Sequence, residues 1–121
     1  MWDRTRWSFV SSEMEDLPDA IRRYFDADAR RDTEAIVTLF SEAAIVIDEG
    51  EAHSGIGGIR SWREEVTSKY EYTTEVVDAQ HTSDAEYVLT GRLAGNFPGG
   101  TADLTWRFTL DGDHINRLHI A

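Results

Sequence analysis

Apolar residues recur at helical spacing in three segments of the N-terminal part of the chain. Their spacing predicts a first helix that begins near Pro18 and a third helix over residues 58–69. Between these two, a short second helix is expected, capped by Asp32 or Thr33. The apolar stripe of the first helix includes Tyr24, so this side chain is expected to face the interior.

Other segments have the pattern of strands, and these strands are expected to form the sheet that the helices cover. Residues 43–47 are all apolar and three of them are β-branched, which predicts a buried strand that ends on Asp48. The polar segment 49–58 is expected to be a loop. Further segments rich in β-branched and aromatic residues, separated by turn signals, predict strands over residues 73–81, 86–97, 101–110 and 114–120. Helices first and antiparallel strands after indicate an α+β domain, with the helices packed on one face of a curved sheet.

Asp48 is the sharpest chemical feature of this pattern. Alternate side chains of a strand share a face, so Asp48 points the same way as Ala44 and Val46, toward the buried interior. A carboxylate at the mouth of an apolar cavity suits a general base. The alternative is that Asp48 only opens the turn at Glu49-Gly50, since aspartate is a common turn residue.

Composition narrows the classes of function. The 121 residues make one domain of ordinary size, and the absence of cysteine excludes disulfides and thiolate chemistry. The net charge of -11 argues against nucleic acid and anionic membranes as partners, because both bind through lysine and arginine clusters. No apolar run approaches the ~20 residues that span a bilayer, and the N-terminus lacks the pattern of a secretory signal. A cytoplasmic location is therefore expected.

Two parts of the chain are less informative. Residues 1–16 show no clean period despite two tryptophans, and we interpret them as an N-terminal extension that covers a sheet edge, a cavity mouth or a partner subunit. The four histidines are scattered, without the spacing of a metal site, and no cofactor motif is present. We therefore expect neither a metal nor a cofactor.

Several segments resemble a known superfamily. Residues 21–25 and 32–40 leading to Asp48, residues 55–59 leading to Trp62, and residues 106–108 followed by Asp-Gly are similar to SnoaL-like and ketosteroid isomerase-like domains of the nuclear transport factor 2-like superfamily. The resemblance covers residues 17–121. It implies a cone-shaped α+β fold, with about three N-terminal helices packed on a strongly curved, mostly antiparallel sheet. It also implies a pocket for a small apolar molecule and a homodimer formed through the exposed face of the sheet.

The comparison with ketosteroid isomerase assigns roles to single residues. The tyrosine of the isomerase's oxyanion hole falls on Tyr24, and its proton-abstracting aspartate falls on Asp48. Its second oxyanion acid falls on Leu104, which leaves the oxyanion hole half built. Asp103 is adjacent, but one step along a strand points to the opposite face. This departure argues against true ketosteroid isomerase activity.

Other side chains are candidates for the pocket. His53 follows Asp48 and is either a second acid/base or ligand donor, or a loop histidine that meets solvent. Four residues are expected to line the cavity, although ordinary core packing explains them equally well: Trp62, Leu104, Trp106 and Phe108. Arg117 and His119 enter the pocket if the face of the last strand that carries Ile115 is concave. If that face is convex, they belong to a dimer surface or to solvent.

Two classes of function follow from these residues. The first is a cofactor-independent isomerase, cyclase or dehydratase acting on a small apolar carbonyl compound. In it Asp48 takes a proton next to the carbonyl, Tyr24 donates to the developing enolate oxygen, and His53 or His119 returns the proton or holds the ligand. The second is a non-catalytic domain that binds a hydrophobic molecule or serves as a dimer module, which the leucine at position 104 favours.

Overall fold

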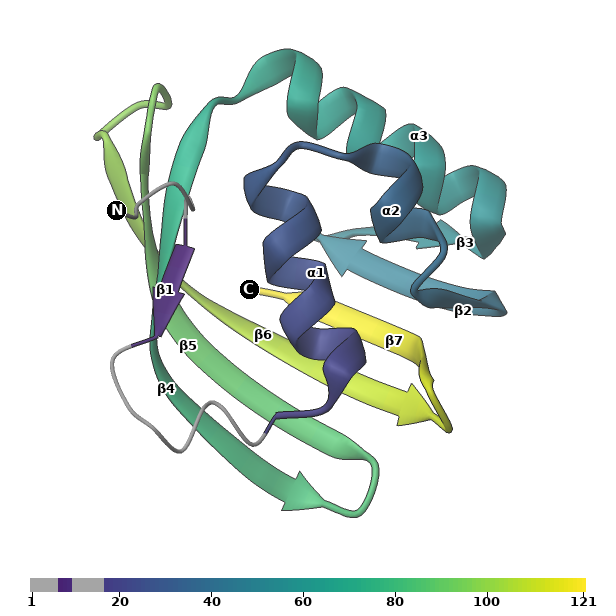
Figure 1. Cartoon of the computed structure of the whole chain (residues 1–121). Helices are drawn as coiled ribbons and strands as arrows, with labels where there is room; N and C mark the ends of the chain where they lie inside the picture. Colours follow the sequence, from purple (N-terminus) through teal and green to yellow (C-terminus); the bar gives the residue numbers. More distant parts are fainter. Residues whose placement is uncertain (1–6, 10–16) are drawn as a thin grey trace.

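Three helices cover one face of a single curved sheet (Figure 1). The computed structural model describes residues 7–9 and 17–121. The helices are α1 (Asp19–Ala29), α2 (Thr33–Val37) and α3 (Gly55–Lys69). Most of the predicted N-terminal extension lies outside the described residues; the backbone of residues 7–9 forms a short strand, β1 (Trp7–Phe9).

Six further strands complete the sheet, and they follow the predicted segments closely. They are β2 (Phe40–Asp48), β3 (Glu51–Ser54), β4 (Tyr72–Ser83), β5 (Glu86–Gly95), β6 (Thr101–Asp111) and β7 (His114–Ile120). The strand order is β1-β4-β5-β6-β7-β2-β3. The pairs β1–β4 and β2–β7 are parallel, and the others are antiparallel. The predicted α+β architecture is confirmed.

The prediction of a loop over residues 49–58 is wrong except for the turn at its first two residues. Strand β3 returns along β2 after the two-residue turn Glu49-Gly50, and Asp48 pairs with Glu51. Both turn residues have positive φ, 54° and 79°, as a type I′ hairpin turn requires. The four residues of β3 are mostly polar, so they lack the alternation of apolar and polar residues that predicts a strand. Helix α3 then begins at Gly55, three residues earlier than predicted.

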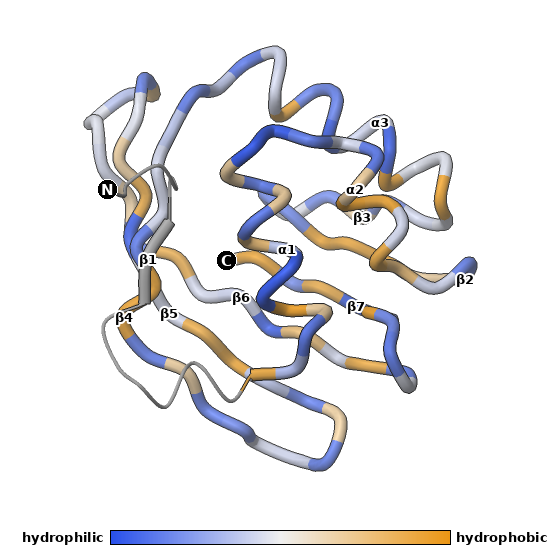
Figure 2. The backbone as a smooth tube through the Cα atoms, in the orientation of Figure 1, coloured by the Kyte–Doolittle hydropathy of each residue, from blue (hydrophilic) through white to orange (hydrophobic). Residues whose placement is uncertain are grey.

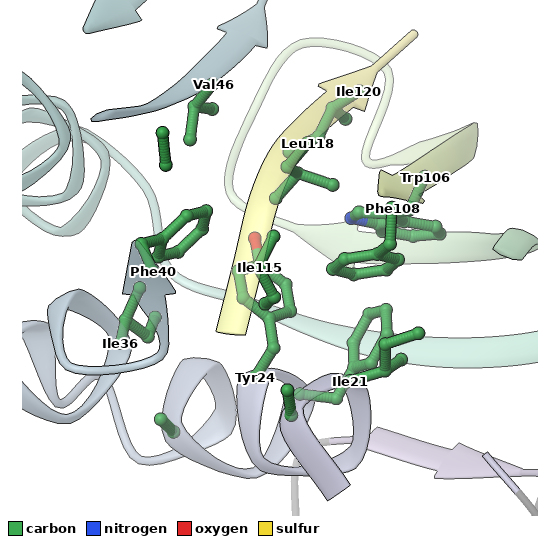
Figure 3. Packing of buried hydrophobic residues seen from close by; sticks show 14 of the residues in the cluster. Ile21, Tyr24, Ile36, Phe40, Val46, Trp106, Phe108, Ile115, Leu118 and Ile120 are labelled. Atoms are coloured by element: carbon green, nitrogen blue, oxygen red, sulfur yellow. The ribbon is translucent and has the colours of Figure 1, made fainter. Parts of the chain in front are cut away.

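The core fills the space between the helices and the sheet. Aromatic rings meet edge to face across it: Tyr24 (Figure 3) lies 5.4 Å from Phe108 between ring centroids. Phe25 lies 5.3 Å from Trp106, also between centroids. Figure 2 shows apolar residues alternating with polar ones along the strands, which is the pattern of a sheet with one buried face. The inward stripe predicted for α1 is confirmed, since Ile21 and Tyr24 are both buried.

Gly91 on β5 lies against the ring of Trp106 on the neighbouring strand β6. A Cβ atom at this position would collide with the carbonyl oxygen of Glu75 and lie 3.1 Å from Cζ3 of Trp106. The pairing of β4 with β5 also shifts register between Val76 and Asp78. The sheet is therefore irregular and closely packed near Gly91, and the benzo edge of Trp106 rests on this glycine.

Arg31 fastens the C-terminal end of α3 and gives the first testable prediction. Its guanidinium donates to the carbonyl oxygen of Tyr70 at 2.7 Å and to that of Thr67. Charged donors stabilise the last carbonyls of a helix, so Arg31→Ala is expected to lower the free energy of unfolding by about 2 kcal/mol. Urea denaturation measures this, with an unchanged slope.

The matched control is Arg30→Ala. Arg30 makes only exposed ion pairs, with Asp26 and Asp32, and such pairs contribute roughly 0–1 kcal/mol. Equal losses for the two variants would show that the cap does not hold α3.

Candidate active site

A cavity of about 300 Å³ opens between the helices and the concave face of the sheet. Its walls come from α1, α3, the sheet and the loop after β5. The lining residues include six aromatic side chains: Tyr24, Trp62, Tyr70, Tyr72, Phe97 and Trp106. A volume of this size and an aromatic lining suit a small, mostly apolar molecule.

Asp48 lies in the wall of this cavity at the end of β2. The indole N–H of Trp62, on α3, donates to Oδ2 of Asp48 at 2.9 Å. Within the described part of the chain, the other carboxylate oxygen has no hydrogen-bond partner and Asp48 makes no ion pair. Trp62 therefore fixes the orientation of the carboxylate and leaves one oxygen open to a ligand.

Tyr24 reaches into the same cavity from α1, and its ring rises toward the sheet (Figure 3). Only 2% of the residue is exposed, yet its hydroxyl has no hydrogen-bond partner among residues 7–9 and 17–121. Burial raises the pKa of this hydroxyl well above its usual value of 10.0, and the nearby charge of Asp28 adds to the effect. The hydroxyl therefore keeps its proton and is available as a donor.

Sheet register places Asp48 and Trp106 on either side of Ile120. Asp48 pairs with Ile120 across β2 and β7, and Ile120 pairs with Trp106 across β7 and β6. All three residues line the cavity. Because neighbouring strands lie about 4.8 Å apart, the backbones of Asp48 and Trp106 are separated by roughly 10 Å. A flat ligand lying over Ile120 would touch both residues.

A buried polar network forms another part of the cavity wall. Arg63 donates from Nη2 to Oδ1 of Asp28 at 2.9 Å, and the hydroxyl of Tyr72 donates to the same oxygen. Arg63 is 2% exposed and Asp28 is 7% exposed. Burial alone would lower the pKa of Arg63, but the charge of Asp28 outweighs it and raises that pKa, so the guanidinium stays charged.

Sequence reasoning assigned no role to this network. Asp28 falls at the helical spacing of the inward stripe of α1, and a carboxylate on that stripe requires a partner. That requirement was the available signal. The partner itself, Arg63, could not be identified, because it comes from a different helix and sits beside Trp62 in a polar stretch of α3.

Three of the four predicted lining residues are in the cavity wall, namely Trp62, Leu104 and Trp106. The prediction that Phe108 lines the cavity is wrong. This residue is fully buried against Tyr24 in the core, outside the cavity lining. Asp103 points away from Leu104 to the outer face, where it accepts a hydrogen bond from Arg92 at 2.8 Å. It therefore cannot replace the acid that is missing at position 104, as predicted.

His53 also lies outside the cavity, which corrects its expected position. It pairs with Val46 across β2 and β3, and its ring lies 6.2 Å from the Trp62 ring between centroids. It lines a neighbouring hollow that shares Asp48, Glu49 and Trp62 with the cavity. The hydrogen bond between Trp62 and Asp48 therefore belongs to the wall that the two hollows have in common.

Arg117 and His119 do not enter the cavity. The pairing of β7 with β6 skips one residue at Asn116, so Ile115 and Leu118 both point inward although they are three positions apart. This bulge reverses the parity of the strand and places Arg117 and His119 on the outer face. The predicted alternation started from Ile115 and was wrong because a bulge changes the face of every residue after it. The outer face is the one through which the homodimer is predicted.

Comparison with solved structures identifies the relatives of this fold. A candidate polyketide cyclase from Sinorhizobium meliloti is 34% identical, with a TM-score of 0.83, and the alignment covers 88% of this chain and 97% of that one. The chain belongs to the SnoaL-like family of the nuclear transport factor 2-like superfamily. No protein-family model and no curated protein matches it.

More distant structures support the SnoaL-like fold alone. A ketosteroid isomerase-like protein from Catenulispora acidiphila, solved with trimethylamine, is 15% identical with a TM-score of 0.78, covering 87% of this chain and 85% of that one. A candidate polyketide cyclase from Pseudomonas putida is 18% identical with a TM-score of 0.74, covering 85% and 88%.

The described part of the SnoaL-like domain contains neither a membrane-spanning helix nor a cluster of metal-ligating side chains. No helix in the described part of the chain is long and apolar enough to cross a membrane. Within residues 7–9 and 17–121, no group of three histidine, aspartate or glutamate side chains is arranged to hold a metal ion.

Proposed function

We propose that this cavity is the active site of a cofactor-independent isomerase, cyclase or dehydratase acting on a small, mostly apolar carbonyl compound. The observation that carries the proposal is the presence, in one cavity, of a carboxylate with a free oxygen and a buried hydroxyl with a free proton. These groups belong to Asp48 and Tyr24. A base and a hydrogen-bond donor are the two groups that enolisation needs.

The reaction begins with a proton transfer. The free oxygen of Asp48 takes a proton from the carbon next to the carbonyl, and the electron pair of the broken C–H bond moves into the new C=C bond. The carbonyl oxygen gains negative charge, and the Tyr24 hydroxyl stabilises it by donating a hydrogen bond. The enolate then takes the proton back from Asp48 at another carbon, attacks a second carbonyl, or expels a leaving group.

The positions of the histidines simplify this scheme. His53 and His119 were candidates for returning the proton, but neither lines the cavity. Asp48 lines it and carries the proton after the first step, so it is the group that returns it. No second residue is needed for an isomerisation in which one carboxylate serves both carbons.

The experiment that tests the function is exchange of substrate protons with solvent deuterium. Cyclic ketones and β,γ-unsaturated ketones are incubated with the protein in D₂O, and NMR follows the loss of the signals next to the carbonyl. We expect exchange above background for at least one ketone, in proportion to protein concentration. Heat-denatured protein is the control, because Lys69, other ionisable side chains and the buffer also promote exchange.

A second candidate function is binding without turnover. Leu104 favours it, because it points into the cavity where ketosteroid isomerase has an acid. In that case a ketone binds in the cavity and its protons exchange no faster than in the control. The same exchange experiment therefore separates the two candidates.

A further inference from the structure

Trp106 is a buried residue in the cavity wall whose indole N–H has no acceptor among the described residues. The residue is 4% exposed, and within the described part of the chain its indole N–H makes no hydrogen bond. Buried polar groups are nearly always paired, and a buried tryptophan usually finds a partner for its N–H. A free N–H in the wall of a cavity is therefore a sign of a ligand atom that accepts from it.

The ring is oriented so that this N–H faces away from β5. Atom Cζ3 of Trp106 lies against Gly91 of β5, and Nε1 is attached to the ring carbon directly opposite Cζ3. Figure 3 shows the indole nitrogen on the side of the ring nearer β7. Beyond β7 lies β2 with Asp48, so the N–H points toward the part of the cavity where the base lies.

Six side chains in the cavity wall carry a hydroxyl or an indole N–H: Tyr24, Trp62, Tyr70, Tyr72, Thr74 and Trp106. Trp62 donates to Asp48, and Tyr72 donates to Asp28, so these two are occupied. The other four have no acceptor among residues 7–9 and 17–121, and Trp106 differs from Tyr70 and Thr74 in its register, because only Ile120 separates it from Asp48 across the sheet. Trp106 also follows Leu104 by two positions on the same face of β6, which makes it the next inward side chain after the missing acid.

We propose that the indole N–H of Trp106 is a second hydrogen-bond donor for the ligand's oxygen, beside the hydroxyl of Tyr24. The ligand class that fits is an uncharged, flat ketone or enone. This inference rests on the proposed function in one respect, because both require that a carbonyl compound binds in this cavity.

Charge in the cavity wall excludes the carboxylic acids of similar shape. Asp48 and Glu49 line the cavity, and no described residue forms an ion pair with either of them. The charge of Arg63 is balanced by Asp28. The wall is therefore negative where the ligand enters, and an anionic ligand is repelled while a neutral ketone is not.

The direct test follows the indole proton during titration with 1-indanone, a flat and uncharged ketone. Proton–nitrogen spectra of the wild-type protein show the indole N–H groups of its four tryptophans, and Trp106→Phe assigns the signal of Trp106. We expect this signal to move downfield as 1-indanone binds. The signal of Trp62 is the internal reference, because its N–H stays on Asp48.

Affinities test the same contact independently. Trp106→Phe is expected to weaken 1-indanone binding by about tenfold and to change the binding of indane, the hydrocarbon of the same shape, much less. Phe108→Leu is the packing control, since Phe108 is buried on the same face of β6 but outside the cavity lining. Its affinity ratio of 1-indanone to indane should equal that of the wild type.

Three results would overturn the assignment: an unmoved Trp106 signal at saturation, equal losses for 1-indanone and indane, or no binding of 1-indanone to the wild type. The proposed function fails separately. If 1-indanone binds with the expected shift and no ketone of the exchange experiment loses its protons faster than in the control, the donor stands and the proposed function fails.

Discussion

Asp48→Asn is expected to slow protein-catalysed proton exchange by about 10³-fold, and Tyr24→Phe by about 10² to 10³-fold. Asparagine keeps the size of the side chain and can still accept the hydrogen bond from Trp62, but it takes no proton. Phenylalanine keeps the ring in the core and loses only the hydroxyl. Deuterium exchange into a ketone found to be a substrate, measured by NMR, gives both rates.

Glu49→Gln is the matched control for the base. Glu49 is the next residue along the chain and also lines the cavity, so its variant removes a charge from the same wall. Its exchange rate should stay near that of the wild type. If Glu49→Gln loses as much as Asp48→Asn, the wall charge and not one base explains the effect. A fully active Asp48→Asn variant would refute the assignment outright.

The pH dependence provides a further check on Tyr24 within the same experiment. Burial raises the pKa of its hydroxyl well above 10.0, so the donor remains protonated throughout the neutral and moderately alkaline range. The exchange rate should therefore show no loss from Tyr24 ionisation at or below pH 10. A drop centred on pH 10 or lower would mean that the hydroxyl is solvated rather than buried.

Arg63→Met is expected to lower the free energy of unfolding by about 3–5 kcal/mol. The variant leaves the buried carboxylate of Asp28 without its cation, and an uncompensated buried charge is far more costly than the loss of the attraction alone. Urea denaturation measures the difference, with the slope showing whether unfolding remains two-state.

Two further variants separate charge compensation from packing. Combining Asp28→Leu with Arg63→Met removes both charges, and most of the lost stability should return because an apolar pair of similar volume needs no compensation. Arg60→Met on the exposed face of α3 removes an arginine that pairs with Glu34 in solvent, and its stability should stay near that of the wild type. A double variant as unstable as Arg63→Met alone would contradict this account.

The parts of the site that obey a simple period were predictable from sequence. Tyr24 lies on a helical stripe, and Asp48 shares a strand face with Ala44 and Val46. The periods of the helix and the strand were therefore sufficient to predict that both side chains point inward. The parts that break a period were not predictable. The bulge at Asn116 reverses the face of Arg117 and His119, and nothing in the residues themselves marks where a strand gains an extra position.

Longer-range contacts explain the remaining differences. Strand β3 is held by its pairing with β2 and by the left-handed turn before it, rather than by an apolar pattern of its own. The ion pair of Asp28 with Arg63 joins two helices that are separated by α2 and the hairpin of β2 with β3. Asp28 falls at the spacing of the inward stripe of α1, but its partner Arg63 comes from a distant helix and is brought to it only by the tertiary fold.

The parallel pairing of β2 with β7 also has a consequence for how the protein is made. The helices and the hairpin of β2 with β3 leave the ribosome early, whereas β7 appears after the other described strands. Contacts between segments far apart in sequence form late, because the intervening chain must first lose the conformational entropy of a long open loop. A nascent chain that ends after β6 has both Asp48 and Trp106 but lacks the strand between them. The site is thus assembled only after β7 has been synthesised.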